Sequence, residues 1–201
     1  LKIQSYMTCD SINQSIKKGV MTMTKCTWCQ SDALSETYHD EEWGIPLHDD
    51  QKHFEYLMME VMQCGLSWTL MLKKRETFRK CFDHFDYEKI AAYDDVKIAE
   101  IMATENMIKS ERKIRAIIGN AVRFKEIIAE FGSFDEFLWA YSGYKTIVYK
   151  SHQKQHVASN DLSDAISKEL KRRGFQVSGV DYCLLPPAGL RHHQRPRGEM
   201  L

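Results

Sequence analysis

The sequence predicts an all-α fold, because apolar residues recur at helical spacing along most of the chain and strand-like alternation is nearly absent. Only residues 146–149 alternate as a strand would. The chain has 201 residues, of which 43% are hydrophobic and 11% aromatic, so it can bury a sizeable core. It contains no internal repeat and no low-complexity segment, and its length lies between one domain and two.

Helix-capping residues indicate where the predicted helices begin in the first half of the chain. Residues 26–46 are rich in Trp, His, Asp and Gly and predict a loop with short helical turns. Asp49 or Asp50 can cap the next helix. Ser67 then opens a short apolar segment that ends in the basic run 73–75. The apolar stripe of the capped helix consists of Phe54, Leu57, Met58 and Val61.

The second half of the chain predicts further helices. Residues 86–103 follow helical spacing less regularly. Ser110 caps the strongest helix, which Gly132 ends, and Ser133 starts another. After a polar loop, the last helix is stopped by Gly174. The apolar positions of this last helix are Leu162, Ile166 and Leu170.

Charge and composition exclude several classes of protein. Basic and acidic residues number 28 each, so the formal net charge is zero, which excludes a binder that acts through bulk positive charge. The basic and acidic residues are unevenly distributed along the chain. Residues 184–201 hold three Arg and one Glu, and the preceding residues hold 25 basic and 27 acidic groups, a net charge of −2. This tail differs in composition from the rest of the chain.

The ends and the cysteines give expectations about location. Residues 1–23 are polar and aperiodic, and we expect a disordered leader in which Met21 and Met23 are candidate start sites. No run approaches the roughly 20 apolar residues of a membrane span. Six cysteines in a chain of this length do not form a dense disulfide framework. We therefore expect a reduced, cytoplasmic protein.

A candidate zinc site consists of Cys26 and His39, with Cys29 and His48 nearby. Thiolate and imidazole are ligands that zinc prefers, and a structural site needs four of them. A buried free thiol and a hydrogen-bonded histidine explain the same residues, and the residues alone favour that interpretation. Spacing alone leaves both interpretations open.

A carboxylate among aromatic residues is the strongest candidate for a binding pocket. Glu60 lies at the edge of its helix's apolar stripe, about 60° from Leu57 at 100° per residue, and is either solvated or half-buried with a partner. Aromatic rings can sandwich a nucleic-acid base while the carboxylate accepts its N–H hydrogens. The same rings can equally fill a helical core. The aromatic residues in question are Trp28, Tyr38 and Trp43, from residues 26–46, and Trp68, eight positions after Glu60.

The polar turn at residues 106–114 connects two predicted helices. Backbone N–H groups beside a helix N-terminus, with Lys109, Arg112 and Lys113 nearby, can grip a DNA phosphate. An ordinary helix–helix connection with a solvated basic face is the alternative.

Motifs that follow one another along residues 24–183 resemble a known family. They are Lys25-Cys26-x-Trp28, Tyr38-His39-Asp40-x-Glu42-Trp43-Gly44-x-Pro46, Glu60 with Gly65-Leu66-Ser67-Trp68, Leu72-Lys73-Lys74-Arg75-Glu76, Phe82-x-x-Phe85-Asp86, Lys113-Ile114-x-Ala116-Ile117-Ile118-x-Asn120-Ala121 and Ser163-x-x-Ile166-Ser167-x-x-Leu170-x-x-Arg173-Gly174-Phe175. In this order they resemble the DNA-3-methyladenine glycosylase I family. The resemblance marks residues 24–183 as the glycosylase domain and 184–201 as an aberrant tail.

The resemblance implies a helix-hairpin-helix DNA glycosylase fold with an N-terminal zinc-binding segment. It implies hydrolysis of the N-glycosidic bond to 3-methyladenine in alkylated double-stranded DNA, which opens base excision repair, by a monomer. Matched residue by residue, Glu60 is the base-recognising and candidate catalytic carboxylate. Tyr38 and Trp68 are stacking aromatics, and Trp28 is a further pocket aromatic.

The resemblance also assigns a metal site and a DNA-binding hairpin. Cys26 and His39 match the first two ligands of a structural zinc. The hairpin departs from the family, since its first residue stands where a Gly is frequent and residues 110–112 differ from the usual basic turn. The hairpin residues expected to hold the DNA backbone are Asn106, Ile108, Lys109, Ser110 and Lys113.

The chemistry that the resemblance implies is consistent with these residues. A base alkylated at N3 is cationic and already a good leaving group, so the enzyme need not protonate it. Ionised Glu60 suits recognition of that cation, and whether it also activates water is open. No lysine in the matched pocket motifs is an obvious imine-forming nucleophile, which predicts a monofunctional enzyme without strand scission.

The tail departs from the family. The family's Asn-Asp-His-x3-Cys stretch, which completes its zinc site, aligns with Gln194, Arg195, Pro196 and Met200. Reading the degenerate codons of this stretch one nucleotide later permits the family's residues in register, which predicts a frameshift near residue 184. Occupancy by zinc is therefore doubtful. Alternative functions are a non-catalytic helix-hairpin-helix DNA-binding protein that lost turnover through this tail, and a zinc-stabilised interaction module without a nucleic-acid role.

Overall fold

The computed structural model describes residues 29–30, 32–148, 161–176 and 190–191. Apart from one parallel pair of two-residue strands, the regular secondary structure of the described residues is helical, so the predicted all-α class is confirmed. The helices are α2 (Ala33–Glu41), α3 (Asp50–Gln63), α4 (Trp68–Cys81), η2 (Asp83–Phe85), α5 (Tyr87–Ile90), α6 (Asp95–Ala103), α7 (Glu111–Phe131), α8 (Phe134–Ala140) and α9 (Asp161–Arg172), and the strands are β1 (Ile147–Val148) and β2 (Leu190–Arg191).

Several predicted boundaries are confirmed by caps. Asp49 accepts a hydrogen bond from the Lys52 amide at the start of α3, and Ser133 accepts one from the Glu136 amide at the start of α8. Gly132 ends α7 with a φ of +91°, a left-handed conformation that favours glycine. The predicted leader 1–23 lies outside the described residues, as does the tail 184–201 apart from β2.

Other boundaries differ from the prediction. Residues 26–46 contain a nine-residue helix, α2, because Asp32 accepts hydrogen bonds from the Leu34 and Ser35 amides and caps it. The segment that Ser67 opens continues as α4 to Cys81, six residues beyond the basic run, since its buried face extends through Phe78.

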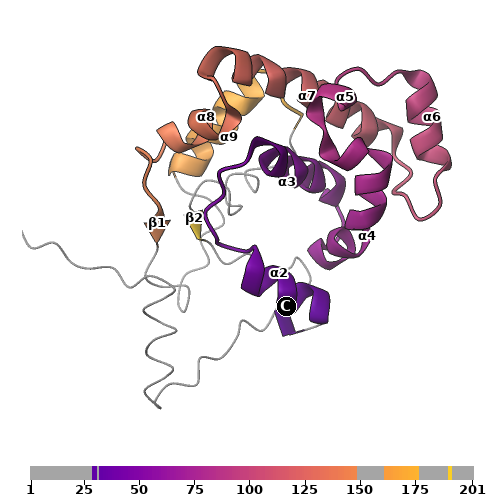
Figure 1. The fold of residues 1–201 in the computed structure, drawn as a ribbon, viewed down its shortest axis with the longest axis horizontal. Coiled ribbons are helices and arrows are strands. Elements are labelled where there is room, and N and C mark those ends of the chain that lie inside the picture. The colour runs from indigo at the N-terminus through magenta and orange to yellow at the C-terminus, as the bar shows by residue number, and fades with distance from the viewer. Residues whose placement is uncertain (1–28, 31, 149–160, 177–189, 192–201) are drawn as a thin grey trace, which may run out of the picture.

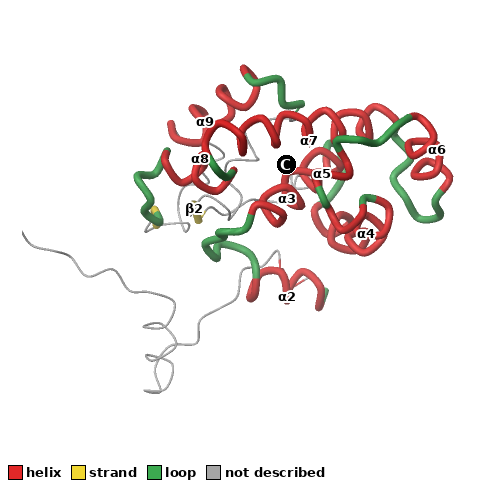
Figure 2. Tube along the Cα trace, turned by 45° about the horizontal axis from the view of Figure 1, so that its top comes forward, coloured by secondary structure: helices red, strands yellow, loops and turns green. Residues whose placement is uncertain are grey.

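The layout places α3 at the centre of the molecule. The long helix α7 runs along one side and packs against α3, α5, α6 and α8 (Figures 1 and 2). On the other side lie α4, which contacts α3, and α2, which contacts α4. No helix in the described part of the chain is both long and apolar enough to cross a membrane.

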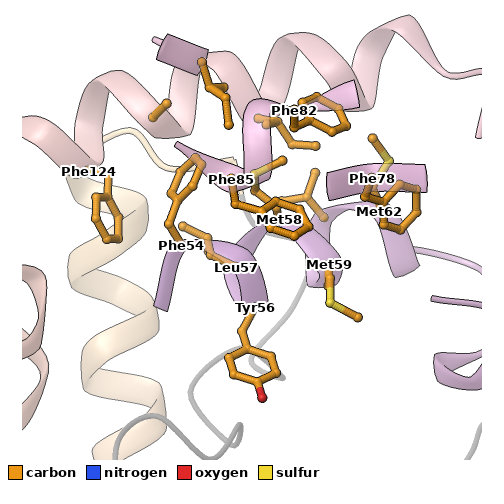
Figure 3. Close-up of a cluster of buried hydrophobic side chains, with 14 of the residues drawn as sticks. Phe54, Tyr56, Leu57, Met58, Met59, Met62, Phe78, Phe82, Phe85 and Phe124 are labelled. Atoms are coloured by element: carbon orange, nitrogen blue, oxygen red, sulfur yellow. The ribbon is translucent and has the colours of Figure 1, made fainter. Parts of the chain in front are cut away.

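The core between α3 and its neighbours is aromatic and rich in methionine. The ring of Phe54 lies 5.1 Å from that of Phe124 on α7, which stacks in turn on Phe134 of α8 at 4.2 Å. Figure 3 shows Phe54 and Phe124 together with Leu57 and Met58 in this cluster. Complete burial of each such side chain contributes about 1.5–3 kcal/mol.

Helix α3 is buried on every side, although the sequence predicts a single apolar stripe. Residues 53–62 are all buried, including the polar side chains of His53, Glu55 and Glu60. In Figure 3 the Tyr56 ring points away from the hydrophobic cluster. Because Glu60 comes one turn after Tyr56, the two share this second face of α3, which faces the candidate site.

Candidate functional site

Three neighbouring helices each contribute one of the expected pocket residues. Tyr38 lies on α2, Glu60 on α3 and Trp68 at the start of α4. The Tyr38 and Trp68 rings are 5.5 Å apart between centroids and inclined by 52°. Tyr38 and Glu60 are 3% and 7% exposed, so both are buried. The fourth expected pocket residue, Trp28, lies outside the described residues.

The electrostatics of Tyr38 link these residues. Its pKa is raised well above the ordinary value, first by burial and then by electrostatic interactions with Tyr56, Glu60 and Glu42. The phenol therefore keeps its proton at neutral pH. Since Glu60 is among the charges that act on Tyr38, the carboxylate and the rings form one site.

The turn before α4 brings Trp68 to the pocket. Gly65 has a φ of +81°, which favours glycine, and no heavy atom lies within 4 Å of where a Cβ would stand. Ser67 accepts a hydrogen bond from the Leu70 amide and caps α4. The indole Nε1 of Trp68 is buried and has no hydrogen-bond acceptor in the described part of the chain.

A buried ion-pair cluster lies beside the pocket, and sequence reasoning missed it. Arg75 donates two hydrogen bonds to Glu42, at 2.7 and 2.8 Å, and a third from Nε to Glu55 at 2.5 Å. The Tyr56 hydroxyl donates to Glu42 at 2.5 Å. Glu42 and Arg75 belong to two of the motifs, but their sequence separation gives no sign of a contact.

The cluster keeps its carboxylates charged. Burial alone would raise the pKa of Glu42, but the hydrogen bonds from Arg75 and Tyr56 outweigh it and hold the pKa below its ordinary value. The pKa of Glu55 is lowered in the same way, since Arg75 and Lys52 outweigh burial. Burial and the bond to Glu42 raise the pKa of Tyr56. The cluster is therefore two carboxylates bridged by one guanidinium.

The candidate metal ligands are described in part. His39 bonds through Nδ1 to Asp40 at 2.8 Å and stacks on Trp43 at 5.6 Å. A carboxylate on one ring nitrogen is the usual support of a metal-binding histidine. Cys26 lies outside the described residues, Cys29 is buried, and no group of three metal-binding side chains occurs among the residues described.

His48, the other histidine of that segment, belongs to a different cluster. Its Nδ1 lies 3.0 Å from Asp135 of α8, and its ring stacks on Trp139 at 4.4 Å. Asp135 also bonds the fully buried His53 at 2.9 Å. Burial raises the pKa of Asp135, but the two histidines outweigh it and lower the pKa. His48 therefore helps to dock the loop before α3 onto α8.

The expected DNA-binding turn joins α6 to α7. Asn106 has a φ of +62°, a left-handed conformation that asparagine tolerates better than most residues, which explains how it replaces a glycine. Lys109 is exposed, and Ile108 and Ser110 are half-buried. Ser110 stands at the N-cap of α7 without a capping side-chain bond. Amide groups at this helix start therefore lie beside an exposed lysine.

Two lysines fasten this turn to the pocket helices. Lys113 donates to the carbonyl oxygens of Met62 and Cys64 at the end of α3, at 2.6 and 2.9 Å. Lys74 of α4 donates to the carbonyl oxygen of Asn106 at 2.5 Å. Lys113, expected to contact DNA, thus directs its ammonium group at the protein backbone.

Comparisons with known proteins match most of the chain. A family model described as methyladenine glycosylase matches residues 28–193, and the match ends before Pro196 and Met200. With DNA-3-methyladenine glycosylase 1 of Escherichia coli (strain K12), the chain is 38% identical over 162 residues, 80% of this chain and 87% of the relative. With the DNA-3-methyladenine glycosylase of Haemophilus influenzae it is 37% identical over 161 residues, with the same shares covered.

Solved structures match the fold. A crystal structure of 3-methyladenine DNA glycosylase I has a TM-score of 0.76 at 35% identity, with 83% of this chain and 93% of that chain covered. A structure of that enzyme from Staphylococcus aureus, which describes 3-methyladenine recognition, has a TM-score of 0.75 at 32% identity, covering 82% and 89%. A Tyr-to-Phe variant in complex with 3-methyladenine has a TM-score of 0.76 at 32% identity, covering 83% and 91%.

Proposed function

The chain belongs to the methyladenine glycosylase family, and as a DNA glycosylase it releases 3-methyladenine from alkylated DNA; we propose that Tyr38, Glu60 and Trp68 bind the base. The observation that carries this proposal is the convergence of the three helices. They bring the ring centroids of Tyr38 and Trp68 to 5.5 Å, and the buried Glu60 is near enough to act electrostatically on Tyr38.

The pocket suits the chemistry of an N3-alkylated base. Methylation at N3 leaves the base with a positive charge, which an aromatic face and a buried carboxylate both attract. Glu60 accepts N–H hydrogens of the flipped base, and Tyr38 and Trp68 contact its faces. The cationic base then leaves on hydrolysis of the N-glycosidic bond, without a proton from the protein.

The reaction is proposed to be monofunctional. Lys74 of α4 and Lys113 of α7 bond backbone carbonyl oxygens. Burial lowers the pKa of Lys113, but its nitrogen is engaged by two acceptors and is not presented to a sugar. Both arrangements support hydrolysis by water and the absence of strand scission.

The turn between α6 and α7 is proposed to be a helix-hairpin-helix that holds one strand of double-stranded DNA, with the enzyme acting as a monomer. The exposed Lys109 and the amides that precede Ser110 would receive the phosphate, where the dipole of α7 adds to the attraction. Asn106 and Ile108 would shape the turn. Lys113 would act from behind by fastening the turn to α3.

Zinc is proposed to bind weakly in this chain. His39, held by Asp40, suits a metal ligand, and Cys26 would be its partner. The family's other two ligand positions hold Pro196 and Met200, which do not supply imidazole or thiolate. The residues therefore do not complete a four-ligand site, and the base-release reaction does not depend on one.

The test is release of 3-methyladenine from methylated duplex DNA, measured by chromatography, for the wild type, Glu60→Gln and the control Glu126→Gln on the outer side of α7. We expect E60Q to lose about 10²-fold or more in rate, since it removes the charge that the cation meets, and to keep duplex affinity. E126Q, a half-exposed position, should match the wild type. Equal rates for wild type and E60Q would refute the proposed role of Glu60. Salt-dependent duplex binding by a wild type that releases no base would instead identify a non-catalytic DNA-binding protein.

A further inference from the structure

The pocket residues and the ion-pair cluster lie on the same three elements. Glu42 follows α2, Glu55 and Tyr56 are on α3, and Arg75 is on α4. One guanidinium on α4 therefore bonds carboxylates that belong to the two other pocket helices. Among the described residues, the neighbouring Arg79 of α4 pairs with Glu55 but not with Glu42, so Arg75 is the arginine that joins all three elements.

Each cluster residue is linked closely to one pocket residue. The Glu42 amide donates to the carbonyl oxygen of Tyr38 at 3.0 Å, so the position of Glu42 determines the end of the Tyr38 helix. Tyr56 and Glu60 are one turn apart on α3 and share a face.

On α4, the cluster residue Arg75 is likewise close to one pocket residue, Trp68. Arg75 follows Trp68 by seven residues, which is two turns, so their side chains leave α4 in nearly the same direction. The ion-pair cluster therefore connects the same elements that carry Tyr38, Glu60 and Trp68.

The geometry of the cluster demands an arginine. The planar fork of Arg75 spans both oxygens of Glu42, at 2.7 and 2.8 Å, while Nε reaches Glu55 at 2.5 Å. A lysine ammonium is a point charge and cannot maintain this two-carboxylate pattern. Arg75 and Glu55 are 8% and 4% exposed, so water has little access to the bond between them, although Lys52 and Arg79 also bond Glu55, at 2.9 and 3.1 Å.

A buried ion pair is weak evidence for added stability, because desolvation of the charges offsets their attraction. Its more specific effect is to hold its partners in one arrangement. Base recognition requires such an arrangement, because a misplacement of about 1 Å in a site can cost about 10²-fold in rate.

We propose that Arg75 is a positioning residue for base recognition, which acts through Glu42, Glu55 and Tyr56 to set the spacing of Tyr38, Glu60 and Trp68. The inference rests on the proposed function of these three residues. Arg75 touches no base and transfers no proton.

The experiment compares R75K, Y56F and a matched control, R173K. Arg173 follows α9 and makes the same pattern of bonds, two to Glu130 at 2.6 and 3.0 Å and one from Nε to Glu169 at 2.8 Å. It therefore repeats the bond pattern away from the three pocket helices, at a more exposed site, since the Glu130 side chain is 53% exposed. Y56F removes one hydroxyl and tests the cluster without removing a charge.

Four measurements separate positioning from folding: the thermal midpoint, affinity for a duplex with a tetrahydrofuran abasic site, affinity for free 3-methyladenine by tryptophan fluorescence, and the single-turnover release rate. For R75K we expect about tenfold or greater losses in base affinity and release rate, with abasic-site affinity within about twofold. Y56F should show smaller losses of the same kind. R173K should change only the thermal midpoint.

Three results would overturn the proposal. They are a lower midpoint of R75K with unchanged base affinity and release, equal losses in R75K and R173K, or an unfolded R75K with a Y56F that matches the wild type in every measurement. A wild type that releases no 3-methyladenine would instead count against the function of the site. Base affinity is measured without turnover, so the two failures remain distinct.

Discussion

The ammonium group of Lys113 lies 2.9 Å from the carbonyl oxygen of Cys64, and so joins the start of α7 to the turn that leads into the pocket. A second bond, to Met62 at 2.6 Å, anchors the same group at the end of α3. The last carbonyls of a helix have no partners within it, and a cation there also meets the negative end of the dipole. The bonds of Lys113 thus connect the start of α7 to the end of α3 and to the turn before Trp68.

We predict that Lys113→Met lowers the free energy of unfolding by about 2 kcal/mol, because it leaves two carbonyl oxygens without their charged donor. It should barely change the salt dependence of duplex binding, since the group already faces the protein. Lys109→Met, at an exposed position, should lower the slope of log K against log salt by about one. Urea unfolding and binding titrations at several salt concentrations measure both effects. The reverse ranking of the two slopes would show that Lys113 contacts a phosphate.

The backbone of Asn106 gives a prediction for the hairpin. Its φ of +62° costs an alanine about 1–2 kcal/mol more than a glycine, because the Cβ approaches a carbonyl oxygen. We expect Asn106→Ala to lower the thermal midpoint and Asn106→Gly to leave it equal or higher. Since Lys74 binds the carbonyl of Asn106 and not its side chain, that bond should survive in both variants. Equal midpoints for the two variants would contradict the left-handed conformation.

Low pH should lower the free energy of unfolding, because it protonates Glu42 and Glu55, the carboxylates bound to Arg75. The pKa values of Glu42 and Glu55 are lowered in the folded state, so their contribution to stability is full above the unfolded value of about 4.3. It is lost as the pH falls through the folded pKa values, because the unfolded chain takes up the protons first. Urea midpoints between pH 7 and pH 2 test this expectation.

The variant Arg75→Met supplies the comparison for that titration. Without the guanidinium, both carboxyl groups lose a hydrogen-bond donor that opposes burial, so their folded-state pKa values should rise, less for Glu55, which keeps Lys52. The decline in stability should then begin at higher pH than in the wild type. Glu42→Gln removes one titrating group and should give a shallower decline. Profiles of the three proteins that differ only by a constant offset would rule out this linkage.

The zinc content of the purified protein tests whether residues 184–201 complete a metal site. With two of four family ligand positions filled, the purified chain should contain well under one zinc per molecule, and a chelator should leave its thermal midpoint unchanged. A chain whose residues from 184 onward are read one nucleotide later should bind one zinc. Elemental analysis measures both proteins. Near-stoichiometric zinc in the chain as given, or gene codons that exclude the shifted reading, would end the frameshift hypothesis.

The helices were predictable because the signals that start and stop them are local. Asp49, Ser67 and Ser133 each cap a helix where the sequence places one, and Gly132 ends α7. The class of the fold and the family followed from such patterns and from the order of motifs. Longer-range facts were missed: α4 extends beyond its basic run because distant side chains cover its far end.

By itself, the sequence determined the helical class, the caps, the apolar face of α7 and the candidate pocket residues Tyr38, Glu60 and Trp68, since each is written in spacing or in a matched motif. Only the tertiary structure decided that α3 is buried on every side, that Arg75 joins three helices and that Lys113 faces α3. The physical reason is that a charge acquires its role from partners 20 to 51 positions away, and helical periodicity records only near neighbours.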